Sequence, residues 1–305
     1  MTDPWVDVSL WLVAFLDILG YRKVLEGFDA EFVPAGDEDE NAEQFSSHFL
    51  KAVRLRRRLN ERLLELSKDL VPSNWHELPS ESQEQFLALT KTDIVPSTGP
   101  DHVVLACSLS GKGNHMLGVT RIVTATAGAC LIQLALGHDE PDDTRPLRGG
   151  IDLAPGVCLD PERHLYSPGL MRAYDLERKA KYPRVLVGER VRKYIEVFSD
   201  PTTTRPGEEA TTILAQRTQQ LLFMDKVDSS PVLAIDFFGE GYRRLSPSSA
   251  TLEMAHKAWQ YANSALSVAK ASASYRDANE KKSIVEKYEY LVAYMDQRRG
   301  LWGIA

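Results

Sequence analysis

The chain has 305 residues, 43% of them hydrophobic and 26% charged, which is typical of a globular protein with one large domain or two smaller ones. Its net charge of −7 is not that of a protein with a broad basic surface for nucleic acid, although Arg54–Arg58 is locally basic. We recognise no signal peptide and no apolar run of membrane length, and expect a cytoplasmic protein that binds neither membranes nor nucleic acid. The cysteines lack paired spacing, so we expect reduced core thiols at Cys107, Cys130 and Cys158.

The first predicted element is a strand over Val8–Leu16, which is almost wholly apolar, as a strand covered on both faces should be. The strand runs into Asp17, and an ionised carboxylate at the end of such a run needs a cation or several hydrogen bonds. Gly20 follows, and glycine lets the backbone turn so that successive amides can face an anion. The pattern outlines a metal and phosphate site; the structural alternative is that Asp17 caps a helix beginning near Leu19.

A second carboxylate stands at the head of a second predicted strand. Before it, periodic apolar residues predict a long amphipathic helix over 45–70, and four prolines mark 71–100 as connecting material. The segment His102–Leu109 then has the β-branched enrichment of a buried strand, and Asp101 immediately precedes it. Two acidic side chains are therefore placed at strand ends, although spacing alone does not make the strands neighbours.

Helices and strands alternate through the middle of the chain. The pattern predicts a helix over 114–136, a strand over 147–151, a helix over 168–181, a strand over 184–188 and a helix over 189–198. Ser167 is positioned to cap the second of these helices. Gly149 and Gly150 permit a close approach of another backbone to the strand that contains them.

A polar loop at 199–207 divides the chain in this interpretation. We expect a core domain over 1–200, with a helical insert at about 41–90, and an α-rich C-terminal extension over 201–305. The extension should hold a strand pair at 220–225 and 232–238, followed by two helices from about 248 to 295. Because the elements are few and varied in length, the pattern favours an α+β fold over a long doubly wound sheet.

Asp17 and Asp101 would make the metal pair of a phosphoryl-transfer enzyme if their strands are neighbours. Two carboxylates can hold divalent ions against a nucleoside triphosphate, and such ions stabilise charge on the attacked phosphate. The sequence has no GxxxxGK[ST] loop, which excludes a P-loop NTPase, and no combination of Gly-rich loop, HRD and DFG, which excludes a protein kinase.

The segment Phe15–Tyr21 resembles the first metal motif of class III nucleotidyl cyclases, in which F-x-D-I-x-G-F recurs. The resemblance implies that Asp17 and the Ile18 carbonyl bind metal and that Phe15 and the following residues hold the triphosphate. Gly99–Val104 resembles the second motif, with Pro100 interrupting the usual Gly-Asp pair, and this assigns the second metal carboxylate to Asp101. The implied triphosphate-binding residues are Phe15, Leu19, Gly20, Tyr21 and Arg22.

Three further stretches narrow the resemblance to the bacterial Pycsar pyrimidine cyclases. They are Leu147–Ile151, Tyr166–Glu177 and Lys181–Val187, and the similarity runs from about residue 8 to residue 198. Members of that group make cyclic CMP or cyclic UMP during phage infection, and the product activates a separate effector that kills or arrests the host. In the wider family each active site is assembled at the two-fold interface of a dimer, so the resemblance implies a homodimer.

The chain departs from the family at several positions. Where class III cyclases carry an Asn and a transition-state Arg, this sequence has Met171 and Asp175. The catalytic arginine must then come from elsewhere, and the candidates are Arg148, Arg172 and Arg184, each of which has a structural alternative. The usual purine-reading Lys and Asp are also missing, and the nearest positions are Ser97 and His164, which are candidates for base recognition.

The sequence therefore predicts an α+β protein with a ferredoxin-like class III cyclase core. It would convert UTP to 3′,5′-cyclic UMP and pyrophosphate, or CTP to cyclic CMP, with two Mn²⁺ or Mg²⁺ ions per site held by Asp17 and Asp101. One alternative is a catalytically degenerate module that keeps the fold and senses nucleotide. Another is a polymerase-like phosphotransferase with a similar sheet, which would extend a primer instead of closing a ring.

Overall fold

The computed structural model describes residues 8–19, 57, 94–98, 102–110, 115–141, 145–159, 164–203, 208–272 and 278–305. Apart from Arg57, the helix predicted over 45–70 and the insert expected at about 41–90 lie outside these ranges. The sheet and the helices that position the acidic residue at the end of the first strand lie within them.

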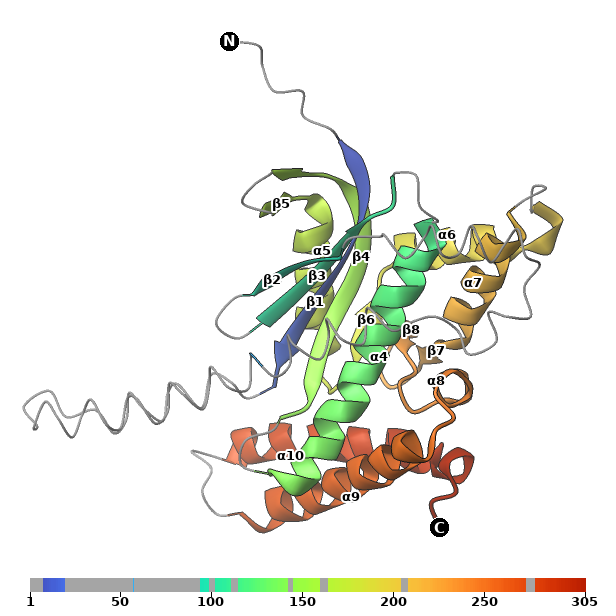
Figure 1. Ribbon diagram of the computed structural model, residues 1–305. Helices are drawn as coiled ribbons and strands as arrows, with labels where there is room; N and C mark the ends of the chain where they lie inside the picture. The colour runs from blue at the N-terminus through green and yellow to red at the C-terminus, as the bar shows by residue number, and fades with distance from the viewer. Residues whose placement is uncertain are drawn as a thin grey trace, which may run out of the picture.

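Four antiparallel strands form one side of the sheet, and all neighbouring pairs among them run in opposite directions (Figure 1). They lie in the order β2-β3-β1-β4, where β1 is Ser9–Ile18, β2 is Ile94–Thr98, β3 is His102–Ser108 and β4 is Leu147–Leu159. The chain passes from β3 to β4 through helix α4, His115–Asp139, and so skips over the central strand β1. This strand order is that of a split βαβ, ferredoxin-like sheet, so the predicted α+β fold is confirmed.

The two faces of β1 carry different residues because side chains alternate along a strand. Leu12, Ala14, Leu16 and Ile18 face the large core that α4 completes. Trp11, Val13 and Phe15 belong to a second, smaller cluster, which Ala173 joins from helix α5, Pro168–Ala180. Asp17 follows this second set in the alternation, so the period-two pattern places its side chain on the α5 face.

Helix α4 is long and apolar enough, by length and composition, to cross a membrane. The expectation that no segment reaches that length is therefore wrong for this helix. In the fold 89% of its most apolar window is buried, because the sheet and other helices surround it. The apolar composition is thus explained by a core helix with almost no solvent-facing side.

The sheet continues beyond β4 into the C-terminal part of the chain. β6, Val185–Val187, runs parallel to β4, then β8, Val232–Ile235, pairs with β6, and β7, Leu222–Asp225, forms the edge. A short strand, β5, His164–Tyr166, pairs with the other end of β4. The predicted strand pair of the extension is present, but it joins the same sheet as the core.

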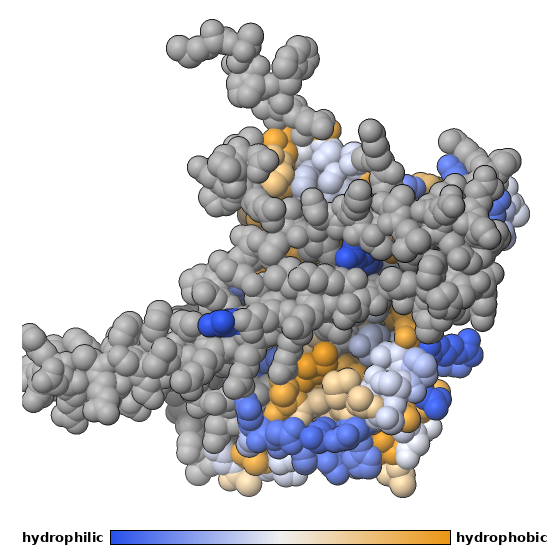
Figure 2. Space-filling model, viewed as in Figure 1, coloured by the Kyte–Doolittle hydropathy of each residue, from blue (hydrophilic) through white to orange (hydrophobic). Residues whose placement is uncertain are grey.

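Further helices pack on α4, on β4 and on the C-terminal strands of the sheet. They are α6 at Glu189–Ser199, α7 at Glu209–Gln220, α8 at Glu240–Leu245, α9 at Ser249–Ala271 and α10 at Ala278–Asp296, with 3-10 turns at Pro201–Thr203 and Arg299–Trp302. The two predicted C-terminal helices are confirmed as α9 and α10, which lie together below α4 in Figure 1. Hydrophilic surface gathers over this lower part of the molecule in Figure 2.

The three cysteines are reduced thiols, as expected. Cys107 on β3 and Cys130 on α4 are buried, and burial raises the pKa of each thiol to about 12. Thiols that hold their protons this firmly are poor nucleophiles and poor metal ligands at neutral pH, so they act as small apolar side chains of the core.

Candidate active site

Asp17 lies at the end of β1 between two neighbouring strands. Its residue partner on β3 is His102 and its partner on β4 is Arg148. Directly opposed residues of antiparallel strands have their Cβ atoms roughly 5 Å apart, so both partners lie within reach of the Asp17 side chain. Asp17 therefore has a neighbouring strand on each side, β3 and β4, and does not lie on an edge strand of the sheet.

The Asp17 carboxylate is held by a guanidinium from β4. Nε and Nη2 of Arg148 both lie 2.9 Å from the same oxygen, Oδ2 of Asp17. Nε of Arg148 is also 2.5 Å from Oε1 of Glu177, a residue of α5. One guanidinium is therefore shared by two carboxylates, which come from segments far apart in the sequence.

Glu177 is the most buried member of this group, with 3% of its side chain exposed against 15% for Asp17. Burial, with an additional contribution from the neighbouring Asp17, raises the pKa of Glu177 to about 7 against the opposing effect of Arg148. The sequence interpretation did not single out this residue. A signal was present, because Glu177 falls on the helix face that Ala173 and Ala180 bury, where a carboxylate needs a partner.

Two local features position helix α5 against the site. Ser167 caps the helix as predicted, its Oγ accepting a hydrogen bond from Gly169 N at 3.0 Å, and Pro168 occupies the first turn. A Cβ on Gly150 would overlap the carbonyl oxygen of Ala173, so the glycine is what allows the helix backbone to lie directly on β4. The prediction of a close backbone approach at Gly149 and Gly150 is confirmed.

An aromatic group lies beside the carboxylates on the same face. The Phe15 ring stacks on the ring of His102 with centroids 4.6 Å apart, and Tyr174 of α5 meets Phe15 edge-on at 5.3 Å. Phe15 is itself 8% exposed. It therefore helps to build the floor of the site and packs His102 against it.

The backbone amide of Leu19 does not face an anion. It donates a hydrogen bond to the carbonyl oxygen of Pro146 at 2.9 Å, which closes the end of the β1–β4 ladder. The assignment of Leu19 to triphosphate binding is corrected on this ground, because its donor is already used. Gly20, Tyr21 and Arg22 lie outside the described residues.

Carboxylate oxygens are the ligands that a hard divalent cation prefers, and Asp17 fits that chemistry. Its charge is met by a cation of its own chain, Arg148, and Glu177 provides a second carboxylate at the same cation. Among the described ranges no group of three or more His, Cys, Asp or Glu side chains is arranged to hold a metal. The donor set is thus partial, and Asp101, the second ligand that the motif implies, lies outside the described residues.

Arg172 precedes Glu177 on α5 and lies near the middle of β4. Its Nε is 3.5 Å from Oδ2 of the buried Asp152, and its Nη2 donates to the Leu153 carbonyl oxygen at 3.4 Å. Nearly a third of the side chain is exposed. Arg172 thus stays accessible on the face that carries Asp17, as do Met171 and Asp175, the residues at the family's Asn and Arg positions.

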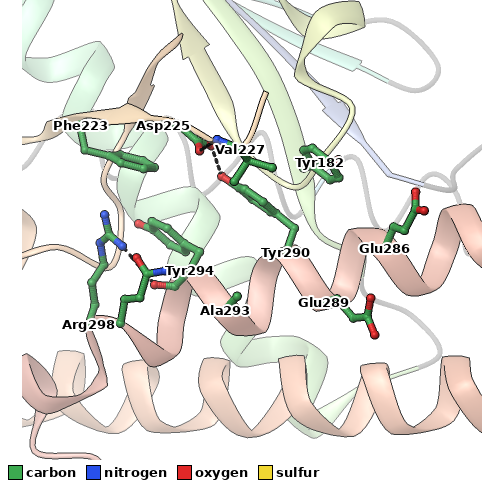
Figure 3. A pocket seen from close by; sticks show the side chains of 11 residues that line it. Tyr182, Phe223, Asp225, Val227, Glu286, Glu289, Tyr290, Ala293, Tyr294 and Arg298 are labelled. Carbon is green, nitrogen blue, oxygen red and sulfur yellow. Dashed lines mark hydrogen bonds between the residues drawn. The ribbon is translucent and has the colours of Figure 1, made fainter. Parts of the chain in front are cut away.

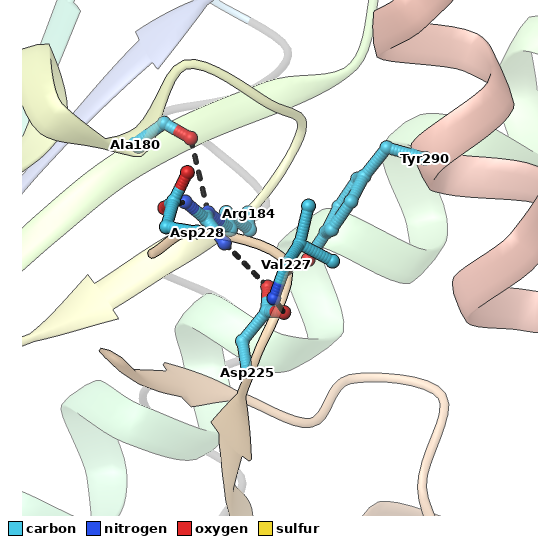
Figure 4. Close-up of polar contacts among 6 residues, drawn as sticks. All are labelled: Ala180, Arg184, Asp225, Val227, Asp228 and Tyr290. Atoms are coloured by element: carbon cyan, nitrogen blue, oxygen red, sulfur yellow. Dashed lines mark hydrogen bonds and ion pairs between the residues drawn. The ribbon is translucent and has the colours of Figure 1, made fainter. Parts of the chain in front are cut away.

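Arg184 is a structural residue. Its guanidinium is buried and donates to Asp225 Oδ2 at 2.5 Å, to Asp228 and, through Nε, to the Ala180 carbonyl oxygen (Figure 4). The Tyr290 ring lies 5.5 Å from the guanidinium carbon. Because its donors are used to join the core strands to the C-terminal region, the assignment of Arg184 as a transition-state arginine is corrected.

The two candidates for base recognition lie apart within one chain. Ser97 is on β2, opposite Val104, which is itself opposite Phe15. His164 is on β5, opposite Leu159 at the other end of β4 from Arg148, up to roughly 35 Å away along an extended strand. The structure does not bring these two positions together in a single copy of the chain.

A separate cavity of about 480 Å³ lies between α10 and β7 (Figure 3). Tyr290 and Tyr294 line it from the helix and Phe223 from the strand. The tyrosine hydroxyls donate to carboxylates of the protein, Tyr290 to Asp225 at 2.6 Å and Tyr294 to Asp236 at 2.8 Å. Its polar groups therefore bond within the fold, and it lies several strands away from Asp17.

Comparisons with known proteins give the following result. No protein-family model matches the chain, and no curated protein matches it in sequence. The chain is similar to the solved adenylyl cyclase CyaB from P. aeruginosa, with 12% identity, 76% of this chain and 96% of that chain covered, and a TM-score of 0.37. It is also similar to a bacterial light-regulated adenylyl cyclase, with 11% identity, 85% of this chain and 59% of that chain covered, and a TM-score of 0.37. Scores this low carry no argument about function, which must follow from the chain's own residues.

Proposed function

We propose that this protein is a nucleotidyl cyclase that converts UTP to 3′,5′-cyclic UMP and pyrophosphate, with CTP to cyclic CMP as the second possibility. In the reaction the ribose 3′-oxygen forms a bond to the α-phosphorus, and the bond from that phosphorus to the bridging oxygen of pyrophosphate breaks. The product would act as a second messenger in antiphage defence by activating a separate effector. A cytoplasmic location belongs to this proposal, because nucleoside triphosphates are made there.

One observation carries the proposal. Asp17 is paired across the sheet with His102, the residue that directly follows Asp101 in the sequence. The described parts of the two class III motifs, Phe15–Leu19 and His102–Val104, thus lie at the same end of adjacent antiparallel strands, which supports a shared metal site there. If the two short motifs matched the family by chance, nothing would require their strands to pair in this register.

The chain's own residues would divide the work. We propose that Asp17, the Ile18 carbonyl and Asp101 hold two Mn²⁺ or Mg²⁺ ions, which when bound supply charge stabilisation at the phosphates and a lower pKa for the attacking hydroxyl. Phe15 packs beneath the site with His102 and limits access of water from below. Arg172 remains a candidate to stabilise negative charge on the phosphates, since part of its guanidinium is exposed on the same face.

We further propose that the active unit is a homodimer with a site at each interface. Large side chains of α5 stand exposed, with Met171 at 62% and Tyr174 at 39%. A second copy over this face would cover them and would supply the base-recognition position that one chain does not bring close. Light scattering of the purified protein should give twice the chain mass, and a monomer that still turns over nucleotide would contradict this arrangement.

The test of function is a product analysis. The purified protein is incubated with each of the four ribonucleoside triphosphates and Mn²⁺, and products are identified by mass spectrometry. We expect cyclic UMP, and cyclic CMP would correct the base while keeping the class. Asp17→Asn should lose product formation by at least about a hundredfold while keeping its thermal unfolding transition, and unchanged product would contradict the mechanism.

A nucleotide sensor without turnover is the competing function, and the departures at Met171 and Asp175 favour it. Such a protein would bind UTP or CTP in equilibrium dialysis and release no pyrophosphate. A polymerase-like enzyme would instead extend a primer, so the same mass spectra separate all three.

A further inference from the structure

Arg148 contacts the carboxylates of Asp17 and Glu177 with different hydrogen-bond geometry. Nε of Arg148 donates an aligned hydrogen bond to Asp17 Oδ2, and Nη2 lies at the same distance from that oxygen. Oε1 of Glu177 is closer to Nε, at 2.5 Å, yet this buried oxygen has no aligned hydrogen bond. A carboxylate side chain that is 3% exposed and has an oxygen without an aligned donor costs folding free energy. Oε1 of Glu177 is therefore ready to accept a hydrogen bond from the adjacent guanidinium of Arg148.

Arg148 is bonded to Oδ2 of Asp17, so a divalent cation on either oxygen of that carboxylate would be a second positive charge close to the guanidinium. Two positive groups this close repel each other strongly in a partly buried site, so binding of an ion favours movement of Arg148 away from Asp17. A guanidinium that left with no other partner would lose its hydrogen bonds. Glu177 already touches its Nε, and can accept that N–H as soon as Asp17 releases it.

We propose that Arg148 is the internal counter-cation of Asp17, and that Glu177 is a positioning residue that takes over the guanidinium when a divalent ion binds Asp17. This inference rests on the proposed function, because it assumes that Asp17 is a metal ligand. In this proposal Arg148 acts on the binding of the divalent ion, before any reaction at the α-phosphate. Arg148 lowers the affinity of Asp17 for the ion, and Glu177 offsets part of that loss.

The proposal predicts opposite effects for two residues that contact each other. Replacing Arg148 by a neutral side chain removes the competitor, so the ion should bind more tightly. Replacing Glu177 by glutamine removes the alternative acceptor, so Arg148 stays on Asp17 and the ion should bind more weakly. Once Arg148 is gone, Glu177 has no guanidinium to hold, so the glutamine substitution should have little further effect beyond the loss of one carboxylate near Asp17.

The experiment measures Mn²⁺ binding to the full chain at pH 8 from the electron paramagnetic resonance signal of the free ion, without nucleotide. We expect Arg148→Met to bind Mn²⁺ on the order of tenfold more tightly than the unaltered protein, and Glu177→Gln several-fold more weakly. The double variant should match Arg148→Met. Arg192→Met is the control, since Arg192 is exposed on α6 and pairs with Glu189 and Glu196 of its own helix. Circular dichroism melting checks that each variant is folded.

The remaining outcomes separate this inference from the function on which it rests. If Arg148→Met leaves Mn²⁺ affinity unchanged or weaker while Asp17→Asn abolishes binding, the metal site stands and the role of Arg148 is overturned. If Glu177→Gln weakens binding equally with and without Arg148, Glu177 acts directly on the ion and the positioning role is overturned. If no variant binds Mn²⁺, the metal site of the proposed function fails as well.

Discussion

Asp225 and Asp17 are two carboxylates that each pair with an arginine of the same chain. Asp225 is 4% exposed and receives hydrogen bonds from Arg184 at 2.5 Å, from the Tyr290 hydroxyl at 2.6 Å and from the Val227 amide at 3.1 Å. Asp17 shares its arginine with Glu177. A buried carboxylate with three donors, such as Asp225, stabilises the fold, whereas the side chain of Asp17 is 15% exposed and more accessible to solvent.

Asp225 gives a prediction about pH. Burial alone would raise its pKa, but the hydrogen bonds from Tyr290 and Arg184 outweigh burial and hold the pKa below the ordinary value of 3.8. The ionised carboxylate therefore contributes stability above about pH 4, and this contribution is lost as the pH falls through the lowered pKa. Asp225→Asn should lower the free energy of unfolding by about 3–5 kcal/mol at pH 7, because it takes one of two carboxylate partners from the buried Arg184.

Urea unfolding of both proteins at pH 7 and at pH 3 measures this difference. The difference in unfolding free energy between the unaltered protein and Asp225→Asn should be smaller at pH 3 than at pH 7. At pH 3 the unaltered protein has begun to lose the interaction of the ionised Asp225 with Arg184. Glu240→Gln, which removes an exposed pair with Arg244, should change neither curve measurably. A loss of equal size at both pH values would show that the charge of Asp225 is not what matters.

At the scale of elements, the predicted strands and helices are confirmed where local signals are strong. The strand before Asp17, the strand after Asp101 and the helix behind Ser167 all lie within a few residues of their predicted ranges. β2 was missed because Pro96 reads as a strand breaker. In the fold β2 is the edge strand of the sheet, where a residue without an N–H is tolerated.

Helix α5 carries Glu177 into the site, and its N-cap is the local feature to test. Ser167 Oγ accepts from Gly169 N and donates to the Pro155 carbonyl oxygen, both at 3.0 Å, so it ties the helix start to β4. Ser167→Ala should lower the free energy of unfolding by about 1 kcal/mol in urea titrations. Ser264→Ala, in the exposed interior of α9, should leave stability unchanged or slightly higher, because alanine is the better helix former. Equal losses in the two variants would argue against a capping role.

At the scale of the molecule, the polar loop near residue 200 does not separate two sheets. β8 pairs with β6 of the core, and Arg184 reaches across to Asp225 and Asp228. Side chains from α7, α9 and α10 share one hydrophobic cluster with β1 and α4. The region after residue 200 therefore completes the core instead of standing beside it.

A fragment that ends at Asp200 should consequently fail to fold cooperatively. It would expose the outer edge of β6, leave Arg184 without its carboxylates and uncover apolar side chains of α4. We expect a broad thermal transition by circular dichroism and early elution on a sizing column, where the full chain gives one sharp transition. A fragment with the sharp transition of a native domain would instead establish residues 1–200 as an independent unit.

By itself the sequence determined the local features: an apolar strand that ends in Asp17, a second strand after Asp101, and a helix capped by Ser167. These follow from hydrophobic periodicity and from backbone preferences that act over a few residues. The tertiary structure alone decided that Arg148 serves Asp17 and Glu177, and that Arg184 is buried with Asp225. The reason is that strand register and helix docking join residues that are tens to more than a hundred positions apart, and no local preference encodes which cation will meet which carboxylate.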